Sequence, residues 1–170
     1  SGLGICYEVK TLPGIEESYP DTLSGEEIPV FIACEKADAY RQTMHSDELI
    51  ITADTIVWLD GLVMGKPEDE EDARRMLRCL SGKTHQVITG VCLTTTEFQK
   101  SFATVTDVTF AELTEEEIDY YVQKYKPMDK AGSYGIQEWI GFVGVEGITG
   151  SYFNVMGLPI QRLYKELKKL

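Results

Sequence analysis

The sequence of 170 residues is poor in positive charge and in histidine, and it has no long apolar run. Lysine and arginine number 16 against 28 aspartates and glutamates, which gives a formal net charge of −12. Proteins that bind duplex nucleic acid carry clustered basic charge, so this balance argues against that class. Two histidines cannot supply a histidine-rich zinc cluster. No apolar run approaches the ~20 residues of a membrane-spanning helix, so we expect no membrane partner.

Close cysteine pairs and two well-known catalytic motifs are also absent. The four cysteines are widely spaced, without a C-x-x-C pair, which argues against metal knuckles and thioredoxin-type sites. The spacing favours reduced thiols and therefore a reducing, cytoplasmic location. Without G-x-x-x-x-G-K-[ST] the chain is not a Walker-type nucleotidase, and without G-x-S-x-G it shows no serine nucleophile elbow.

Hydrophobic residues make up 43% of the chain, and strand-like segments alternate with helix-like ones, which predicts an α/β fold. The turn Asp60-Gly61 predicts a hairpin, and Thr114 with Glu117 predicts a capping box. The glycine-rich stretch 132–157 is expected to hold short strands and turns. We expect helices at about 29–40 and 67–80, after Thr114 and after Pro159, and strands at about 49–59, 62–64, 86–95 and 103–110.

Asp54 does not fit its surroundings, because it lies inside the apolar strand 49–59. An ionised carboxylate in such a strand is costly unless it is paired or binds a metal ion. A structural aspartate that holds a turn or a nearby lysine explains the pattern as well as a functional one does. Residue type alone leaves both interpretations open.

Two lysines are candidates to accompany Asp54. The hairpin register would bring Lys66 back toward the level of Asp54, and a cation near a helix start is unfavourable without an anion beside it. This favours a phosphate-binding role for Lys66, the alternative being a surface lysine. Lys36 lies in the first helix next to Glu35, and on its own that pair is typical of a solvated helix face.

The segment 129–137 contains two glycines and two adjacent opposite charges, Asp129 and Lys130, which predicts a loop. Such a loop can bring backbone groups and a lysine near a ligand. Gln137 can read a base edge, because its amide both donates and accepts hydrogen bonds. An ordinary loop with a surface glutamine is the alternative. His85, directly before a strand, is more typical of a structural histidine than of a catalytic one.

Short segments spread along most of the chain carry a shared pattern. They are Glu35-Lys36-Ala37, Ala53-Asp54-Thr55, Gly65-Lys66-Pro67, Met76-Leu77, Leu80-Ser81-Gly82, Thr84-His85, Thr89-Gly90-Val91, the segment 129–137 and the segment 150–159. Taken in order, these segments resemble the Maf family of nucleoside triphosphate pyrophosphatases. The resemblance covers nearly the whole chain with the expected spacing. The resemblance implies an α/β fold of the inosine-triphosphatase-like type, with a mixed sheet, flanking helices and two lobes around a cleft. The family's opening Ser-x-Ser-Pro-Arg-Arg segment is absent, so we expect one Maf-like domain over residues 1–170 that is incomplete at its N-terminus.

The resemblance also implies a reaction and its residues. It implies hydrolysis between the α and β phosphates of a nucleoside triphosphate, with a divalent cation, Mg²⁺ or Mn²⁺. The catalytic carboxylate falls on Asp54 and the phosphate-binding lysines on Lys36 and Lys66. The loop acid falls on Glu17, which would hold the metal together with Asp54.

Substrate choice is implied at two positions. Thr55 and Gln137 resemble the branch of the family that acts on dTTP and UTP, and modified pyrimidine nucleotides are further candidates. Lys130 would add positive charge for the phosphates. The family favours a homodimer. A non-catalytic nucleotide-binding regulator of septum formation or cell division is the alternative function.

Overall fold

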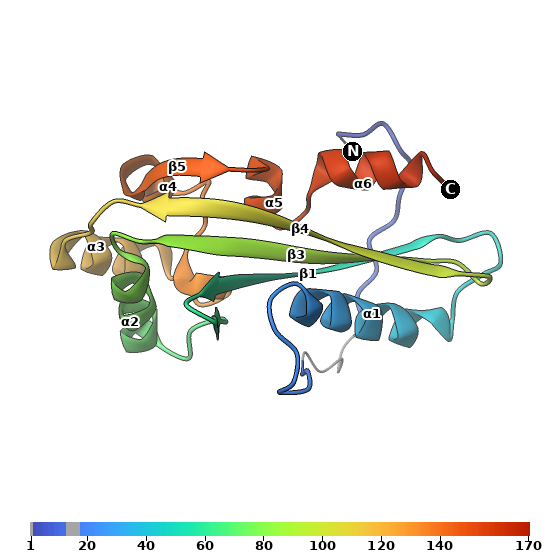
Figure 1. Cartoon of the computed structure of the whole chain (residues 1–170), viewed down its shortest axis with the longest axis horizontal. Helices are drawn as coiled ribbons and strands as arrows, with labels where there is room; N and C mark the ends of the chain where they lie inside the picture. The colour runs from blue at the N-terminus through green and yellow to red at the C-terminus, as the bar shows by residue number, and fades with distance from the viewer. Residues whose placement is uncertain (1, 13–17) are drawn as a thin grey trace.

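The computed structural model describes residues 2–12 and 18–170, and its secondary structure confirms the expected α/β class (Figure 1). In the part described, no helix combines the length and the apolar character that crossing a membrane requires. The helices are α1 (Glu27–Arg41), α2 (Glu70–Leu80), α3 (Glu115–Tyr125), the 3-10 helix η1 (Ala131–Ser133), α4 (Trp139–Gly144), α5 (Tyr152–Met156) and α6 (Ile160–Leu167). The strands are β1 (Ile50–Leu59), β2 (Leu62–Met64), β3 (Thr84–Thr94), β4 (Gln99–Phe110) and β5 (Val145–Thr149).

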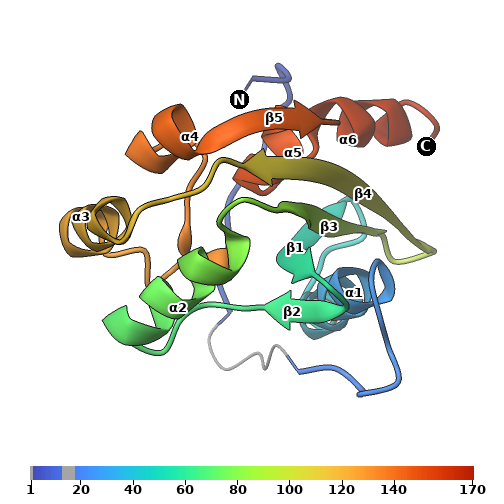
Figure 2. The same ribbon diagram turned by 60° about the vertical axis from the view of Figure 1, so that its left-hand side comes forward.

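The strands form one sheet in the order β2-β1-β3-β4-β5, which can be followed from bottom to top in Figure 2. The expectation of a mixed sheet needs one correction, because every strand pairing among the described residues is antiparallel. Strands β2 and β3 are connected by α2 and run in the same direction. They do not pair with each other, because β1 lies between them. The long pair β3 and β4 is joined by a short hairpin, which enforces the antiparallel direction.

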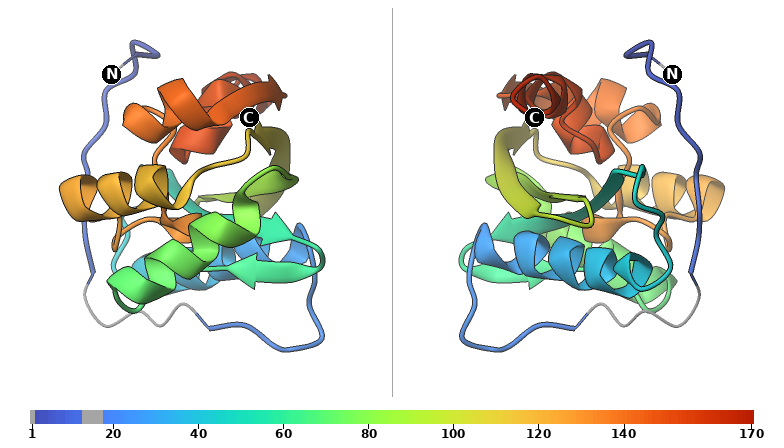
Figure 3. Two further views of the ribbon diagram at one scale, coloured as in Figure 1. Left: turned by 90° about the vertical axis from the view of Figure 1, so that its left-hand side faces the viewer. Right: turned by 90° about the vertical axis from the view of Figure 1, so that its right-hand side faces the viewer.

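Helices cover both faces of the sheet (Figure 3). Side chains alternate between the faces along a strand, so neighbouring residues of β1 belong to different cores. On one face, Ile56 and Ile88 pack against Ile28 and Ile32 of α1. On the other face, α2 and α3 cover one end of the sheet, and Leu163 of α6 packs at the opposite end.

Several local predictions are confirmed. Asp60 and Gly61 have φ angles of 51° and 80°, and Leu59 pairs with Leu62 across them, as a two-residue hairpin turn requires. The capping box of α3 is present: the Thr114 side chain accepts from the Glu117 backbone, and the Glu117 side chain accepts from the Thr114 backbone.

The glycine-rich stretch 132–157 departs from the expectation of strands and turns. It contains β5, but also the helices η1, α4 and α5. These helices have three, six and five residues, which is too short for a helical period to stand out in the sequence. In α4, moreover, Gly141 lies so close to the Ile136 carbonyl that an added Cβ would come within 1.8 Å of its oxygen. The glycine therefore serves close packing and does not mark a turn.

Candidate active site

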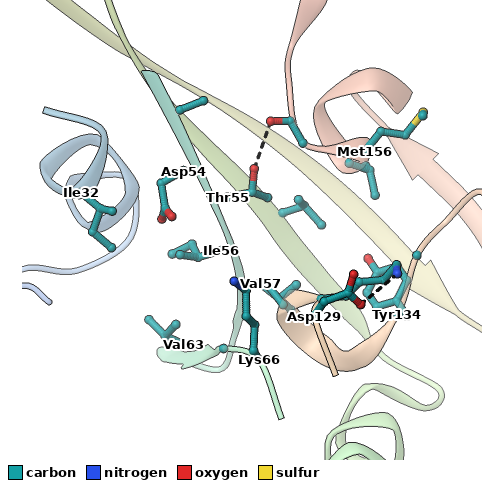
Figure 4. A pocket seen from close by; sticks show the side chains of 18 of the residues that line it. Ile32, Asp54, Thr55, Ile56, Val57, Val63, Lys66, Asp129, Tyr134 and Met156 are labelled. Atoms are coloured by element: carbon teal, nitrogen blue, oxygen red, sulfur yellow. Dashed lines mark hydrogen bonds and ion pairs between the residues drawn. The ribbon is translucent and has the colours of Figure 1, made fainter. Parts of the chain in front are cut away.

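A cleft of about 730 Å³ opens beside β1 (Figure 4). Strand β2 pairs with β1 only from Val57 to Leu59, so in the described chain no strand covers the outer edge of β1 next to Asp54. The cleft occupies this place. Its walls come from α1, β1, the segment after β2, the loop 129–137 and the turn after α5. Lining residues include Tyr19, Ile32, Lys36, Asp54, Thr55, Lys66, Asp129, Lys130, Tyr134, Gln137, Met156 and Gly157.

Asp54 points from β1 into the cleft on the face covered by α1. The Nζ atom of Lys36 lies 3.6 Å from its Oδ1 atom, and the two side chains are 10% and 22% exposed, Asp54 being the less exposed. The same ammonium donates to the Ala53 carbonyl oxygen at 3.4 Å. The misfit seen in the sequence is thus explained, because the carboxylate opens to a cleft and has a cation beside it. This is also the pairing that the structural interpretation of Asp54 requires, so the contact alone does not separate the two.

Helix α1 can bring Lys36 close to Asp54 because β3 has a glycine, Gly90, where the helix packs against it. Gly90 pairs with Asp54 across the sheet. A Cβ atom on Gly90 would lie 2.3 Å from the Val30 nitrogen and 2.4 Å from the Pro29 carbonyl carbon. The first turn of α1 therefore rests directly on the β3 backbone, which a side chain would prevent.

Thr55 lies on the opposite face of the sheet from Asp54. Its Oγ1 is 2.9 Å from the Thr89 hydroxyl and donates to the Gly157 carbonyl oxygen at 3.3 Å. Beneath them the fully buried Asn154 donates through Nδ2 to the carbonyl oxygens of Val87 and Thr104, both at 3.1 Å. These hydrogen bonds fix α5 and the turn after it to the sheet, so this wall of the cleft has a defined position.

The two remaining candidate lysines differ in their surroundings. Figure 4 shows Lys66 extending into the cleft toward the end that holds Asp54. Lys130 is balanced by acids, since its Nζ lies 3.2 Å from Asp129 Oδ1 and 4.0 Å from Glu138 Oε2. The hydrogen bond from Lys130 lowers the pKa of the Asp129 carboxyl, and the charge of Lys66 adds to the effect. The positive charge of Lys130 is therefore largely used within the protein.

The loop 129–137 is anchored to two other elements. The Tyr134 hydroxyl lies 2.6 Å from His85 Nε2 on β3. The Tyr121 hydroxyl of α3 accepts from the Gly135 backbone at 3.0 Å and donates to Glu138 Oε1. Burial lowers the pKa of His85 to about 4, so this histidine is neutral at physiological pH. Its contacts support the structural interpretation, and it does not line the cleft.

The structure brings six of the seven expected site residues to one cleft, and the seventh, Glu17, lies outside the described residues. The sequence reasoning missed two kinds of lining residue. Asp129, Met156 and Gly157 belong to segments that the family resemblance covers, so the signal was present but was not assigned. Tyr19 carried no signal, because ordinary surface and core positions use the same residue type.

The carboxylates near the cleft bear on metal binding. Among the described residues, no three histidine, cysteine or acidic side chains group together as a metal site. Mg²⁺ in nucleotide enzymes is held by one or two carboxylates, water and the substrate phosphates. Asp54 alone meets that minimum, so the donor set fits a cation that binds together with a polyphosphate and does not fit a dedicated protein cage.

Comparison with known proteins agrees with the geometry. The family model described as "Maf-like protein" matches residues 1–170. A Phocaeicola vulgatus protein named dTTP/UTP pyrophosphatase is 81% identical over 170 residues, covering 100% of this chain and 88% of that protein. A Bacteroides fragilis protein of the same name is 71% identical with the same coverage. A Porphyromonas gingivalis protein, also so named, is 54% identical and covers 99% of this chain and 85% of its own length. The chain belongs to the Maf family.

Proposed function

We propose that the chain hydrolyses dTTP and UTP to the nucleoside monophosphate and pyrophosphate. One observation carries the proposal: a carboxylate, Asp54, faces a large cleft with one ammonium, that of Lys36, 3.6 Å away and a second, that of Lys66, lining the same cleft. The names of the relatives supply the substrate class. Modified pyrimidine triphosphates would fit the same chemistry.

The charges in the cleft suit a polyphosphate. The chain carries a net charge of −12, so an anionic ligand needs local positive charge. Lys36, beside Asp54, and Lys66 line the cleft and provide it, whereas Lys130 has two acids, Asp129 and Glu138, within 4.0 Å. Lysine binds phosphate as a point charge. We assign Lys36 and Lys66 to the phosphates and Lys130 to the support of the loop around them.

Asp54 acts on the attacking water in this proposal. Its carboxylate orients a water molecule and takes its proton, and the water oxygen then attacks the α phosphorus in line. A new P–O bond forms at the α phosphorus, the bridging bond to the β phosphate breaks, and pyrophosphate leaves with the bonding electrons. Lys36 and Lys66 stabilise the charge on the phosphate oxygens. Most of the rate enhancement then comes from positioning and electrostatics, as in other phosphoryl transfers.

A divalent cation belongs to the same proposal. Asp54 would hold it, with Glu17 as the second carboxylate. When bound, Mg²⁺ or Mn²⁺ neutralises phosphate charge and lowers the pKa of coordinated water. Loss of turnover on chelation, and its return on adding Mg²⁺ or Mn²⁺, would support this part.

Selection of the base is assigned to Thr55 and Gln137. Gln137 is exposed on the cleft lining, where its amide is available to a ligand. The Thr55 hydroxyl is engaged with Thr89 and Gly157, so Thr55 acts by shaping the wall that the base meets.

The test is a pyrophosphate-release assay with dTTP, UTP, CTP and GTP, run on the wild type and on Asp54→Asn. The variant should lose a factor of ~10² or more in kcat, as expected for removal of a general base. Asp60→Asn is the matched control, because Asp60 lies in the hairpin turn at the end of the same strand and does not line the cleft. Near-normal turnover by Asp54→Asn would refute the proposed role. Nucleotide binding by the wild type without any turnover would instead favour the regulator.

Two further properties stay proposals. A reducing, cytoplasmic location fits the four cysteines, all of which are free. A homodimer fits the exposed aromatic side chains of Phe142 and Phe153, which are 83% and 55% exposed. Light scattering coupled to size exclusion would give the mass in solution, and a monomer at micromolar concentration would refute the dimer.

A further inference from the structure

Two cysteines far apart in the sequence meet behind the cleft. Cys34 lies in α1 and Cys92 in β3, 58 positions away, and their sulfur atoms are 3.5 Å apart. Both thiols are free. Cys92 is fully buried, whereas Cys34 is partly exposed. The sulfur atoms are thus adjacent, and one of the two residues, Cys34, is partly open to solvent.

Tight packing holds these sulfurs together. Ala33 and Ala37, both fully buried, lie with Cys92 in one small cluster, and their short side chains let α1 approach the sheet closely. The Thr52 hydroxyl donates to the Ala33 carbonyl oxygen at 2.7 Å, which ties the helix to β1 beside Cys92. The backbone contact at Gly90 fixes the start of the same helix. The proximity of the two thiols therefore follows from the way α1 is seated.

The surroundings make Cys34 the more reactive thiol. In the neutral pair the Cys34 thiol donates to the Cys92 sulfur. When Cys34 ionises, the Cys92 thiol can donate to the thiolate instead. This interaction lowers the pKa of Cys34 to about 7, a hydrogen bond from Ser101 acts in the same direction, and burial and the Asp38 charge oppose it. The same bond, together with burial, raises the pKa of Cys92. The thiolate is the nucleophilic form of cysteine, so Cys34 is poised to react first and Cys92 to resolve.

We propose that Cys34 and Cys92 are a modification site: they form a reversible intramolecular disulfide when the protein meets a hydroperoxide. The Cys34 thiolate attacks one peroxide oxygen, the O–O bond breaks, and hydroxide leaves, which oxidises Cys34 to a sulfenic acid. The Cys92 sulfur gives up its proton and attacks the Cys34 sulfur, the S–O bond breaks, and water leaves. Overall, two thiols and one hydrogen peroxide give one disulfide and two waters. A dithiol reductant reverses the change.

The disulfide would connect the central sheet to the helix that carries Lys36. A disulfide has an S–S length of about 2.0 Å, so the two sulfurs must approach each other, and the cysteine side chains or α1 itself must shift to allow it. Lys36 follows Cys34 by two residues in α1, and its ammonium contacts Asp54 on β1. This consequence rests on the proposed function: the KM for dTTP should rise about threefold, as when one charge-assisted contact is weakened, with kcat changed less.

The site is tested by mass spectrometry, independently of any activity. The purified protein is exposed to a small molar excess of hydrogen peroxide, alkylated, and digested without reductant. The expected product is a peptide pair joined through Cys34 and Cys92, while Cys6 and Cys79 remain alkylated. Cys92→Ser should abolish the pair, and Cys34→Ser serves the same purpose if the buried serine prevents folding. Cys79→Ser is the matched control and should keep the cross-link.

The outcomes separate the parts of the proposal. Full alkylation of Cys34 and Cys92 after peroxide treatment, or cross-links that run between chains through Cys6, would overturn the site. An unchanged KM in the fully oxidised protein would overturn the link to the cleft and leave the disulfide standing. If the protein had no pyrophosphatase activity at all, the cross-link in the peptide map would still decide the chemical claim.

Discussion

Adding one methyl group at Gly90 should separate α1 from the sheet. The Cβ of Gly90→Ala would lie 2.3 Å from the Val30 nitrogen and 2.6 Å from the Pro29 carbonyl oxygen. Unbonded atoms prefer separations near 3.5 Å, so the helix or the strand must move by about 1 Å. Both neighbours are backbone atoms, which cannot rotate away as a flexible side chain does.

The expected cost follows from this geometry. Overpacking a core costs typically ~1–3 kcal/mol, and a rigid backbone neighbour places Gly90→Ala at the upper end. The replacement of glycine also restricts the unfolded chain, which offsets up to ~1 kcal/mol. We therefore expect the free energy of unfolding to fall by about 2–3 kcal/mol, and the melting temperature of a chain of this size by roughly 5–10 °C.

Gly147→Ala is the matched control for this measurement. Gly147 also lies in a strand, β5, but nothing stands within 4 Å of the position its Cβ would take. Its substitution should leave the free energy of unfolding unchanged or raise it by up to about 1 kcal/mol, because no clash offsets the restriction of the unfolded chain. Urea denaturation of both variants, with dTTP kinetics on the folded fraction, gives the answer. Equal stability of Gly90→Ala and the wild type would refute the close seating of α1, and an unchanged KM would refute its role in placing Lys36.

Three other predictions concern the cleft and its support. The pKa of His85 falls from 6.5 to about 4 on folding, so the unfolded chain takes up the proton first and stability is lost as the pH drops from 6.5 toward 4. His85→Phe should remove up to about 3 kcal/mol of that loss. The measurement is the free energy of unfolding of the wild type and the variant at several pH values between 4 and 7. Parallel pH curves for the two proteins would contradict the prediction. Lys66→Ala should raise the KM for dTTP about tenfold or more, and Lys130→Ala by less, because acids already balance Lys130; the reverse order would show the assignment to be wrong. Gln137→Ala should reduce the preference for dTTP over GTP, and an unaltered preference would exclude Gln137 from base selection.

Local signals in the sequence were sufficient for the hairpin at Asp60-Gly61 and for the capping box at Thr114, because each depends on a few adjacent residues. Asp54 was recognisable as an anomaly for the same reason. Contacts between distant segments were beyond this kind of reasoning. Nothing in the local sequence of His85 indicates a bond to a tyrosine 49 positions away. The short helices α4 and α5 were missed because their packing, and not their periodicity, decides them.

The family resemblance added what residue types could not. Its local sequence alone indicates that Lys36 is an ordinary residue of a helix surface, yet Lys36 lies beside Asp54 in the cleft. The resemblance also grouped six residues that the fold does bring together. It did not give the antiparallel direction of every described strand pair, since that follows from how the connections run.

Two adjacent residues of β1 point to opposite faces of the sheet, so evolution can change one without changing the other. Asp54 meets α1, while Thr55 meets the turn after α5. Mutation at the second position can remodel one wall without touching the carboxylate or its lysine. If Thr55 shapes base selection as proposed, a lineage can acquire a new nucleotide preference by mutation at Thr55 while the carboxylate and its lysine stay in place. A one-residue insertion or deletion upstream in the strand would exchange the two roles and abolish both at once.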